Sequence, residues 1–460
     1  MSGLAAGIRL AQFGKTVLLV ERHNAPGGLN SFYSLGGRKY DVGLHAVTNY
    51  VEAGVRGTPL GKLCRQLRIP REAFGLAPQR YSRIAFPGIE LRFTNQPDYF
   101  TEQVAEVFPA AVDSFRGFER KVLAFDDTNL DQRPQSTRAI LKESIPDPLL
   151  REMLLCPILY YGSARPRDID FDQFVTMYKA LFREGFARPL EGVRRIIRVL
   201  LQRYRETGGE RRMKCGVSKL HINKDRIHHL ELDDGTELTA DHVLSSIGSA
   251  ETQRLLVGTP ETAQTAADEA SARLSFAETI TVLDTDPDAL GCEETITFFN
   301  DSPVFDYASP EEDLIDPRSG VICFPNNYQY PADAQLEEGF LRVTSLASHA
   351  RWTGLTEEEY QAAKNECYER MQDAALRFLP GLDRTRLATH TRDIDMFTPR
   401  TIEKFTGHLG GAVYGSPHKS KDGRTSVQNL YLCGTDQGFL GIVGALLSGI
   451  SMANLHILGK

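Results

Sequence analysis

Glycine turns and acidic residues at the two ends of the chain have the types and spacing that bind a nucleotide. Gly3 opens an apolar helical stripe, and the apolar run at 16–20 is followed by Glu21. An acidic side chain about 20 residues beyond such a glycine meets the hydroxyls of a ribose. The spacing predicts the second half of a βαβ dinucleotide-binding unit, with its strand buried in a parallel sheet.

The first half of that unit is missing from the sequence. The strand that should precede Gly3 is absent, and so are the first two glycines of the Gly-x-Gly-x-x-Gly pattern. Those glycines let a backbone approach a pyrophosphate. We therefore expect the native protein to extend upstream by an apolar strand and Gly-x-Gly, with Met1 an internal methionine. As written, the chain is expected to bind its dinucleotide poorly.

A second turn follows at once. Arg22 comes directly after Glu21, and Pro26, Gly27 and Gly28 form a turn in which a backbone passes close to a partner. Taken alone, a Pro-Gly-Gly turn is more often a plain loop. Its place so soon after the acidic residue favours a cofactor contact.

The middle of the chain has a matching pattern. A basic helix is expected over 193–206, closed by the glycine pair 208–209. Val217 then begins a strand, Asp234-Gly235 forms a hairpin turn, and a strand follows at 238–246. As an isolated hairpin this segment would carry little information.

The C-terminal stretch carries another glycine turn. A short apolar run, typical of a buried strand, ends in Gly434, and an apolar helix is expected to run to Leu458. Asp436, Gly441 and Val443 lie about the start of this helix. A helix N-terminus presents free N–H groups and a positive dipole end, which suit an anion or the polarised edge of a ring system.

The order of these stretches resembles a known family. The series Gly3, Glu21-Arg22, Gly27-Gly28 and Tyr40-Asp41-Val42-Gly43 resembles the FAD-dependent phytoene desaturases and carotenoid isomerases, a branch of the amine-oxidase-like flavoproteins. The resemblance implies FAD as the cofactor. It implies the following cofactor-binding residues: Gly3, Glu21, Arg22, Gly27, Gly28, Val217, Gly434, Asp436, Gly441 and Val443.

The resemblance also implies roles for these residues. Glu21 is expected on the adenosine ribose, the backbone of Val217 at the adenine, and residues 441–444 under the isoalloxazine ring. The acid matching Asp436 is expected on the ribityl or phosphate side. The family usually has Asp-Ser/Thr-x-x-Pro-Gly at this place, and the shifted spelling leaves open whether Asp436 or the backbone of Thr435 makes the contact.

His45 is the catalytic candidate. The resemblance implies that it emerges from a strand toward the flavin, where an imidazole can orient or protonate an intermediate. A histidine held in place for structure is an equal alternative. The family's chemistry is hydride transfer between flavin N5 and a long apolar isoprenoid, in a desaturase, isomerase or saturase. Two alternatives are an amine oxidase and a flavin-free escort protein for prenylated partners.

The elements that must position these residues predict an α/β fold. We expect a Rossmann-like FAD-binding domain, with three layers and a parallel sheet, interleaved with an α+β substrate domain. The FAD-binding domain is expected to comprise residues 1–60, 187–260 and 425–460. The substrate-binding domain is expected to comprise 61–186 and 261–424.

Bulk composition excludes several classes of protein. The 460 residues exceed one ordinary domain, and a net charge of −7 argues against nucleic acid as the main partner. Seven scattered cysteines without a C-x-x-C pair argue against a disulfide framework or a metal site. No apolar run approaches the ~20 residues of a spanning helix. We expect a cytoplasmic protein, either free or attached at a membrane surface.

An aromatic helical face at 171–186 bears on whether the protein attaches to a membrane surface. Its apolar residues recur at i, i+3 and i+4, for which a buried core face is the usual explanation. The sharper hypothesis is a membrane contact or the lining of an isoprenoid tunnel. Arg183, Arg188, Arg194 and Arg195 would then suit anionic lipid headgroups.

Overall fold

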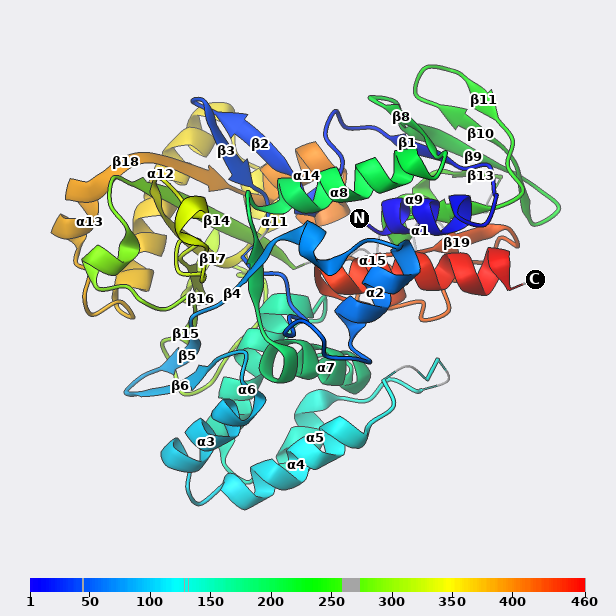
Figure 1. Cartoon of the computed structure of the whole chain (residues 1–460). Helices are drawn as coiled ribbons and strands as arrows, with labels where there is room; N and C mark the ends of the chain where they lie inside the picture. Colours follow the sequence, from blue (N-terminus) through cyan, green and yellow to red (C-terminus); the bar gives the residue numbers. More distant parts are fainter. Residues whose placement is uncertain (44, 128, 131, 259–273, 460) are drawn as a thin grey trace.

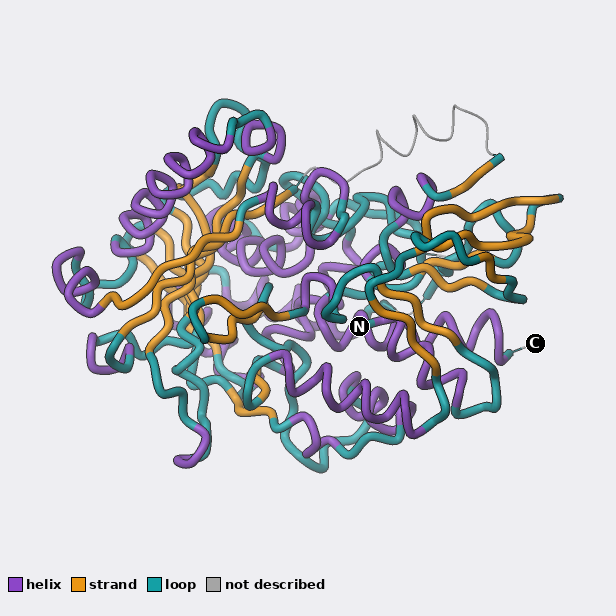
Figure 2. Tube along the Cα trace, turned by 90° about the horizontal axis from the view of Figure 1, so that it is seen from above, coloured by secondary structure: helices purple, strands orange, loops and turns teal. Residues whose placement is uncertain are grey.

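The structure, a computed structural model, describes residues 1–459 except residues 44, 128, 131 and 259–273. Figure 1 shows two regions. The cofactor region, on the right, contains both chain termini, and the sheet region lies on the left with a helical layer below. Figure 2 shows the same arrangement from above, with the strands of the large sheet gathered on the left.

Parallel strand pairs form the middle layer of the cofactor region. Strand β1 (Leu18–Glu21) pairs with β8 (Glu210–Met213), and β12 (Val243–Ser245) pairs with β19 (Leu430–Leu432). Helices cover one side of these strands: α1 (Ser2–Ala11), α8 (Val193–Glu206) and α15 (Gly441–Ala453). A four-stranded mixed sheet covers the other side: β9 (Val217–Asn223), β10 (Arg226–Leu232), β11 (Glu237–Leu238) and β13 (Leu256–Val257), with β13 parallel to β9. The expected α/β class, with a three-layer cofactor region, is confirmed.

Strand β1 is less buried than the sequence predicts. Leu18 is 42% exposed, and the rest of the strand is half-buried. The physical reason is that β1 pairs only with β8, while β12 pairs only with β19. Val17, beside β1, and Leu244 of β12 both pack against α1, so the two parallel pairs flank one helix without bonding to each other.

Helices α1 and α15 pack backbone to backbone. A Cβ built on Gly449 would overlap the carbonyl oxygen of Ser2 and would lie 3.1 Å from the backbone nitrogen of Ala6. Because no side chain fits between them, the two ends of the chain lie side by side, as Figure 1 shows in blue and red. The expected C-terminal helix is confirmed, with its last turn, Asn454–Leu458, in π-helical form.

One helical segment of the described chain, Gly441–Leu458, is long and apolar enough to cross a membrane by length and composition alone. Its mean hydropathy is 1.6, and half of it is buried. Ile442, Val443 and Leu446 pack in one core with α1, α2 (Pro59–Leu67) and α8. Packing in this core accounts for much of its apolar character.

A seven-stranded sheet forms the substrate region. Its order is β18-β14-β17-β16-β15-β5-β6, and all neighbours are antiparallel except β15 and β5. The strands are β5 (Ser82–Phe86), β6 (Ile89–Phe93), β14 (Ser275–Leu283), β15 (Ile296–Asn300), β16 (Ile315–Cys323), β17 (Gly339–Ala347) and β18 (Thr391–Phe397). Both predicted substrate segments, 61–186 and 261–424, contribute strands to this one sheet. The division into domains stays a prediction, and its boundary at 260/261 lies outside the described residues.

Helices cover both faces of this sheet. One face packs under α12 (Glu357–Leu376), with Trp352 fully buried between them. The other face meets a helical layer: α3 (Pro97–Val107), α4 (Val112–Ala124), α5 (Thr137–Ser144), α6 (Pro148–Gly162) and α7 (Phe171–Tyr178). Two short pairings link the regions: hairpin β2 (Phe32–Leu35) with β3 (Arg38–Asp41), and β4 (Leu76–Pro78) with β7 (Ala187–Pro189).

The aromatic face at 171–186 belongs to the core. All seven of its large apolar side chains are at most 1% exposed. Phe182 stacks on Phe100 with ring centroids 4.2 Å apart, and this dense packing leaves the face no contact with a membrane. Two of the arginines expected to bind lipid headgroups form ion pairs within the chain instead, since Arg183 contacts Glu119 and Arg188 pairs with Asp41.

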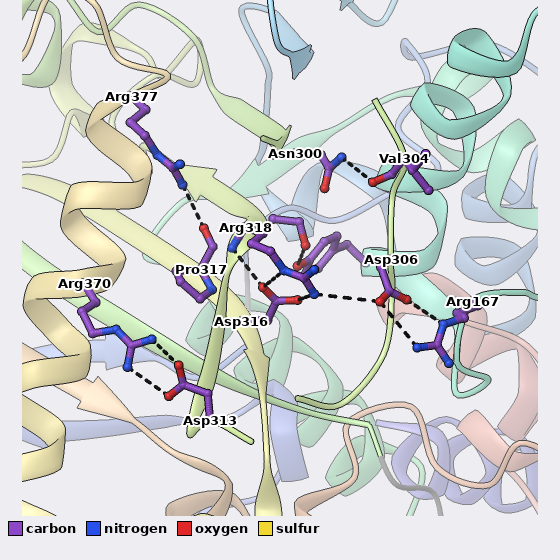
Figure 3. A network of polar contacts seen from close by, with 12 residues as sticks. Arg167, Asn300, Val304, Asp306, Asp313, Asp316, Pro317, Arg318, Arg370 and Arg377 are labelled. Atoms are coloured by element: carbon purple, nitrogen blue, oxygen red, sulfur yellow. Dashed lines mark hydrogen bonds and ion pairs between the residues drawn. The ribbon is translucent and has the colours of Figure 1, made fainter. Parts of the chain in front are cut away.

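An ion-pair network holds the loop between β15 and β16 (Figure 3). Asp306 contacts Arg167 at 2.6 Å and Arg318 at 3.9 Å. Arg370 bonds to Asp313, and Arg377 bonds to the carbonyl oxygen of Pro317. The loop thereby carries buried Phe305 and Tyr307 against the helical layer.

The close packing of α1 on α15 predicts an unusual stability effect. Gly449→Ala should lower the free energy of unfolding by about 1–3 kcal/mol, because the methyl group overpacks a backbone contact. Chemical denaturation followed by circular dichroism measures the free energy of unfolding of both proteins.

The control is Gly117→Ala in α4, where a Cβ would meet only the end of Arg120 at 3.8 Å. Alanine is the better helix former, so this variant should gain about 0.5–1 kcal/mol. A gain of stability in both variants would contradict the packing described for Gly449.

Candidate cofactor and substrate site

The adenosine end of the candidate site lies where β1 ends. Glu21 is brought beside the start of β9, since its carbonyl oxygen accepts the amide of Cys215 at 3.1 Å. One oxygen of the Glu21 carboxylate accepts the amide of His23 at 2.9 Å. The other has no hydrogen bond within the described part of the chain. This free acceptor fits a ribose hydroxyl.

Arg22 fixes the neighbouring segment. Its guanidinium bonds to both carboxylate oxygens of Asp233 at 3.0 Å and to the carbonyl oxygen of Val217 at 3.2 Å. Asp233 also accepts the amide of Gly216 at 2.8 Å, and the bonds from Arg22 hold the pKa of Asp233 below its usual value. The structure therefore brings Glu21, Arg22 and Val217 together, with Arg22 positioning Val217.

The N-terminus of α1 is the expected phosphate end. No side chain caps this helix, so its first N–H groups remain available to an anion. A Cβ on Gly3 would lie 3.3 Å from the hydroxyl of Ser246, and one on Gly434 would lie 2.9 Å from the hydroxyl of Ser2. Residues from opposite ends of the chain thus converge here, and only glycine leaves the space open.

The Pro-Gly-Gly turn adopts backbone angles that favour glycine. Gly27 has φ 121°, and a Cβ there would overlap the carbonyl oxygen of Asn30 and approach Ile197 at 3.2 Å. Gly28 has φ 60° and open space where a Cβ would stand. The turn therefore packs on α8 through Gly27 and leaves Gly28 accessible.

The start of α15 is the expected flavin end. Gly441 has φ 70°, and a Cβ there would lie 3.0 Å from the hydroxyl of Thr48. No side chain caps the helix. The side chain of Val443 is 2% exposed and packs in the core, so Val443 has only its backbone to offer a cofactor.

Asp436 is surrounded by donors from its own chain. Its carboxylate accepts the amides of Ser416 at 2.7 Å and Ser249 at 2.6 Å, and Lys419 lies 3.5 Å away. Both charged side chains are 3% exposed, and burial lowers the pKa of Lys419 against the opposing effect of Asp436. Asp436 therefore ties two loops to the end of β19, and its predicted contact with the cofactor stays a prediction beside that of Thr435.

His45 lies against the substrate sheet in a buried polar centre. Its Nε2 is 3.2 Å from a carboxylate oxygen of Glu278 on β14 and 3.1 Å from the hydroxyl of Thr344 on β17. Arg342 of β17 pairs with the other oxygen of Glu278. Burial alone would raise the pKa of Glu278, but Arg342 and His45 lower it to about 2. We name these four residues the polar centre.

Sequence reasoning found His45 but missed its three partners. The signal for Glu278 is present, since it is the one charged residue in the apolar strand Ser275–Leu283. A buried acid in such a strand requires a partner. Arg342 and Thr344 come from a strand more than 60 residues away, and their pairing depends on the register of β14 with β17.

Comparison with known proteins identifies the family. The family described as flavin-containing amine oxidoreductase matches residues 1–455. The chain belongs to this family. FAD is accordingly its cofactor, and the free acceptor on Glu21, the uncapped helix start at Ser2 and the glycine cradle at Gly434 fit that molecule.

Curated relatives are more distant. A neurosporene-forming phytoene desaturase of Rhodobacter capsulatus is 26% identical over 283 residues, which are 56% of this chain and 52% of that protein. The chain thus spans about half the length of that relative. The chloroplastic prolycopene isomerase of Arabidopsis thaliana is 21% identical over 99% of this chain and 80% of its own length.

Solved structures share the fold. An oxidoreductase from Methanosarcina mazei has a TM-score of 0.68 at 16% identity, covering 100% of this chain and 98% of its own. Putrescine oxidase bound to putrescine has a TM-score of 0.62 at 14% identity, with 100% and 97% covered. Among the described residues, no group of three or more His, Cys, Asp or Glu side chains is placed to hold a metal ion.

The pairing in the polar centre predicts a strong dependence on Glu278. Glu278→Gln leaves the buried charge of Arg342 without its partner and should cost about 3–5 kcal/mol of unfolding free energy. The control Glu338→Gln removes a half-exposed pair with Arg38 and should cost less than about 1 kcal/mol. Equal losses in the two variants would contradict this account.

The same pairing predicts an effect of pH. The pKa of Glu278 is lower in the folded than in the unfolded chain, so its contribution is complete above the unfolded value and is lost as pH falls toward about 2. Glu278→Gln should therefore flatten the loss of stability between about pH 4.5 and 2. Urea denaturation at a series of pH values measures this slope, and an unchanged slope would argue against the low pKa.

Proposed function

We propose that this flavin oxidoreductase acts on a long apolar isoprenoid, a carotenoid or a related polyene, as a desaturase, isomerase or saturase. Bound FAD supplies a flavin N5 that accepts or donates a hydride. The chain holds the cofactor at both of its ends and presents the substrate sheet beside it. His45 is the residue proposed to orient or protonate an intermediate.

The observation that carries the proposal is the charge balance of the polar centre. Glu278 is neutralised by Arg342 and lies 3.2 Å from Nε2 of His45. The nearby carboxylate of Asp41 is neutralised by Arg188 and accepts the amide of Val193. Neither carboxylate is left to bind an ammonium group. A neutral hydrocarbon suits this arrangement better than a polyamine does.

Two further facts support the proposal. The curated relatives are named as phytoene desaturases and a prolycopene isomerase, and the likeness to the isomerase extends over nearly all of this chain. Trp352, the one tryptophan of the sequence, is fully buried on the face of the sheet under α12 and belongs to no aromatic cage around an amine.

Anaerobic flavin reduction tests the proposed substrate class. The FAD-loaded protein should lose its visible flavin absorbance, or convert the polyene spectrum, with phytoene or prolycopene in detergent and not with putrescine or benzylamine. Bleaching by the amines alone would establish the amine oxidase alternative. If the protein carrying the expected upstream strand and Gly-x-Gly binds no flavin at saturating FAD, the escort alternative is favoured.

The role proposed for His45 has its own test. His45→Gln should lower kcat about a hundredfold if the imidazole moves a proton, while the KM for the polyene changes little. The pH profile of kcat should lose one limb. A variant with normal kcat and reduced stability would assign His45 to structure only.

A further inference from the structure

A groove of about 770 Å³ lies along the outer face of α8. Its apolar floor includes Phe32, Ile197 and Leu201. Phe32 is the first residue of β2, shortly after the Pro-Gly-Gly turn, so the groove lies on the outer side of the cofactor region. Nothing in the proposed chemistry uses this surface.

Arginines form the rim of the groove. Arg194, Arg198 and Arg205 recur at i, i+4 and i+11 along α8, a span of about 16 Å on one helical face. Arg211 joins them from β8. The guanidinium groups therefore form a row above the apolar floor.

The acids of the groove neutralise only part of this charge. Glu191 bonds to Arg198 at 2.7 Å, and its carbonyl oxygen accepts from Arg194. Glu206 instead bonds to Gln202 and to Arg203, which is not part of the groove. Within the described chain, the guanidinium groups of Arg205 and Arg211 have no hydrogen bond or ion pair.

We propose that this groove and its rim dock the protein on an anionic phospholipid surface. Guanidinium groups bind phosphate through paired hydrogen bonds, which suits Arg205 and Arg211. A basic helix with an apolar surface beside it is typical of interfacial binding. A soluble phosphate would use the arginines and leave the floor of Phe32 and Leu201 uncovered.

A neighbouring hairpin extends the same surface. Strand β2 begins at Phe32 in the groove and ends at Leu35, which is 46% exposed at the hairpin tip. Figure 1 shows β2 and β3 beside α8 on the upper side of the molecule. Membrane contact is thus proposed at this surface and not at the buried face at 171–186. Docking at this surface does not depend on which substrate the protein converts.

Vesicle flotation tests the proposal with the full chain. The protein should float with vesicles of phosphatidylcholine mixed with phosphatidylglycerol and not with phosphatidylcholine alone. Binding should fall at about 1 M salt, where the Debye length is near 3 Å. Arg205→Gln with Arg211→Gln should weaken the partition about tenfold or more.

The matched control is Arg116→Gln with Arg120→Gln on α4, which removes the same charge from the helical layer on the opposite side in Figure 1. This control should bind as the unchanged protein does. Equal weakening in both double variants would overturn the proposal, as would equal binding to neutral vesicles. Displacement from the vesicles by inorganic pyrophosphate, added to the same total negative charge as the phosphatidylglycerol, would also overturn the proposal. The groove would then be a site for a small anion.

Discussion

The contact between α1 and α15 is the constraint on which the cofactor site depends. Gly449 lets the backbones of the two helices touch, and this places the start of α1 beside the turn that ends β19. Gly3 and Gly434 then face one space, although 431 positions separate them in the sequence. The same contact sets α15 so that Gly441 meets Thr48. Without this contact, the expected phosphate end at α1 and the expected flavin end at α15 would not be held in fixed positions relative to each other.

Much of this could be predicted from the sequence, because the relevant signals are local. Glycines that require positive φ, such as Gly27 and Gly441, mark turns in any fold. The helix expected over 193–206 has the bounds of α8. The half-exposure of β1 could not be predicted, since burial of a strand depends on neighbours that its own residues do not specify.

The polar centre could not be predicted from the sequence either, because its residues meet only through tertiary structure. His45, Glu278 and Arg342 come from three distant segments, and only the register of β14 with β17 brings the last two together. Asp436 belongs to the glycine turn that the sequence shows at the C-terminal end. The amides that donate to it, those of Ser249 and Ser416, come from segments without a sequence signature. The buried charges of the polar centre are paired, whereas the side chains of Arg205 on α8 and Arg211 on β8 have no partner in the described chain and lie above an apolar floor. We propose that the first arrangement serves a neutral substrate and that the second serves a lipid surface.

The central claim is that the two ends of one chain form a single FAD site with Glu21 on the ribose. The most direct measurement is the Kd for FAD of the unchanged protein, of Glu21→Gln and of the control Glu210→Gln, by quenching of flavin fluorescence. The account predicts that Glu21→Gln binds FAD at least about tenfold more weakly, since a hydrogen bond to a charged group is lost, while the control matches the unchanged protein. Equal Kd values for all three proteins would contradict it.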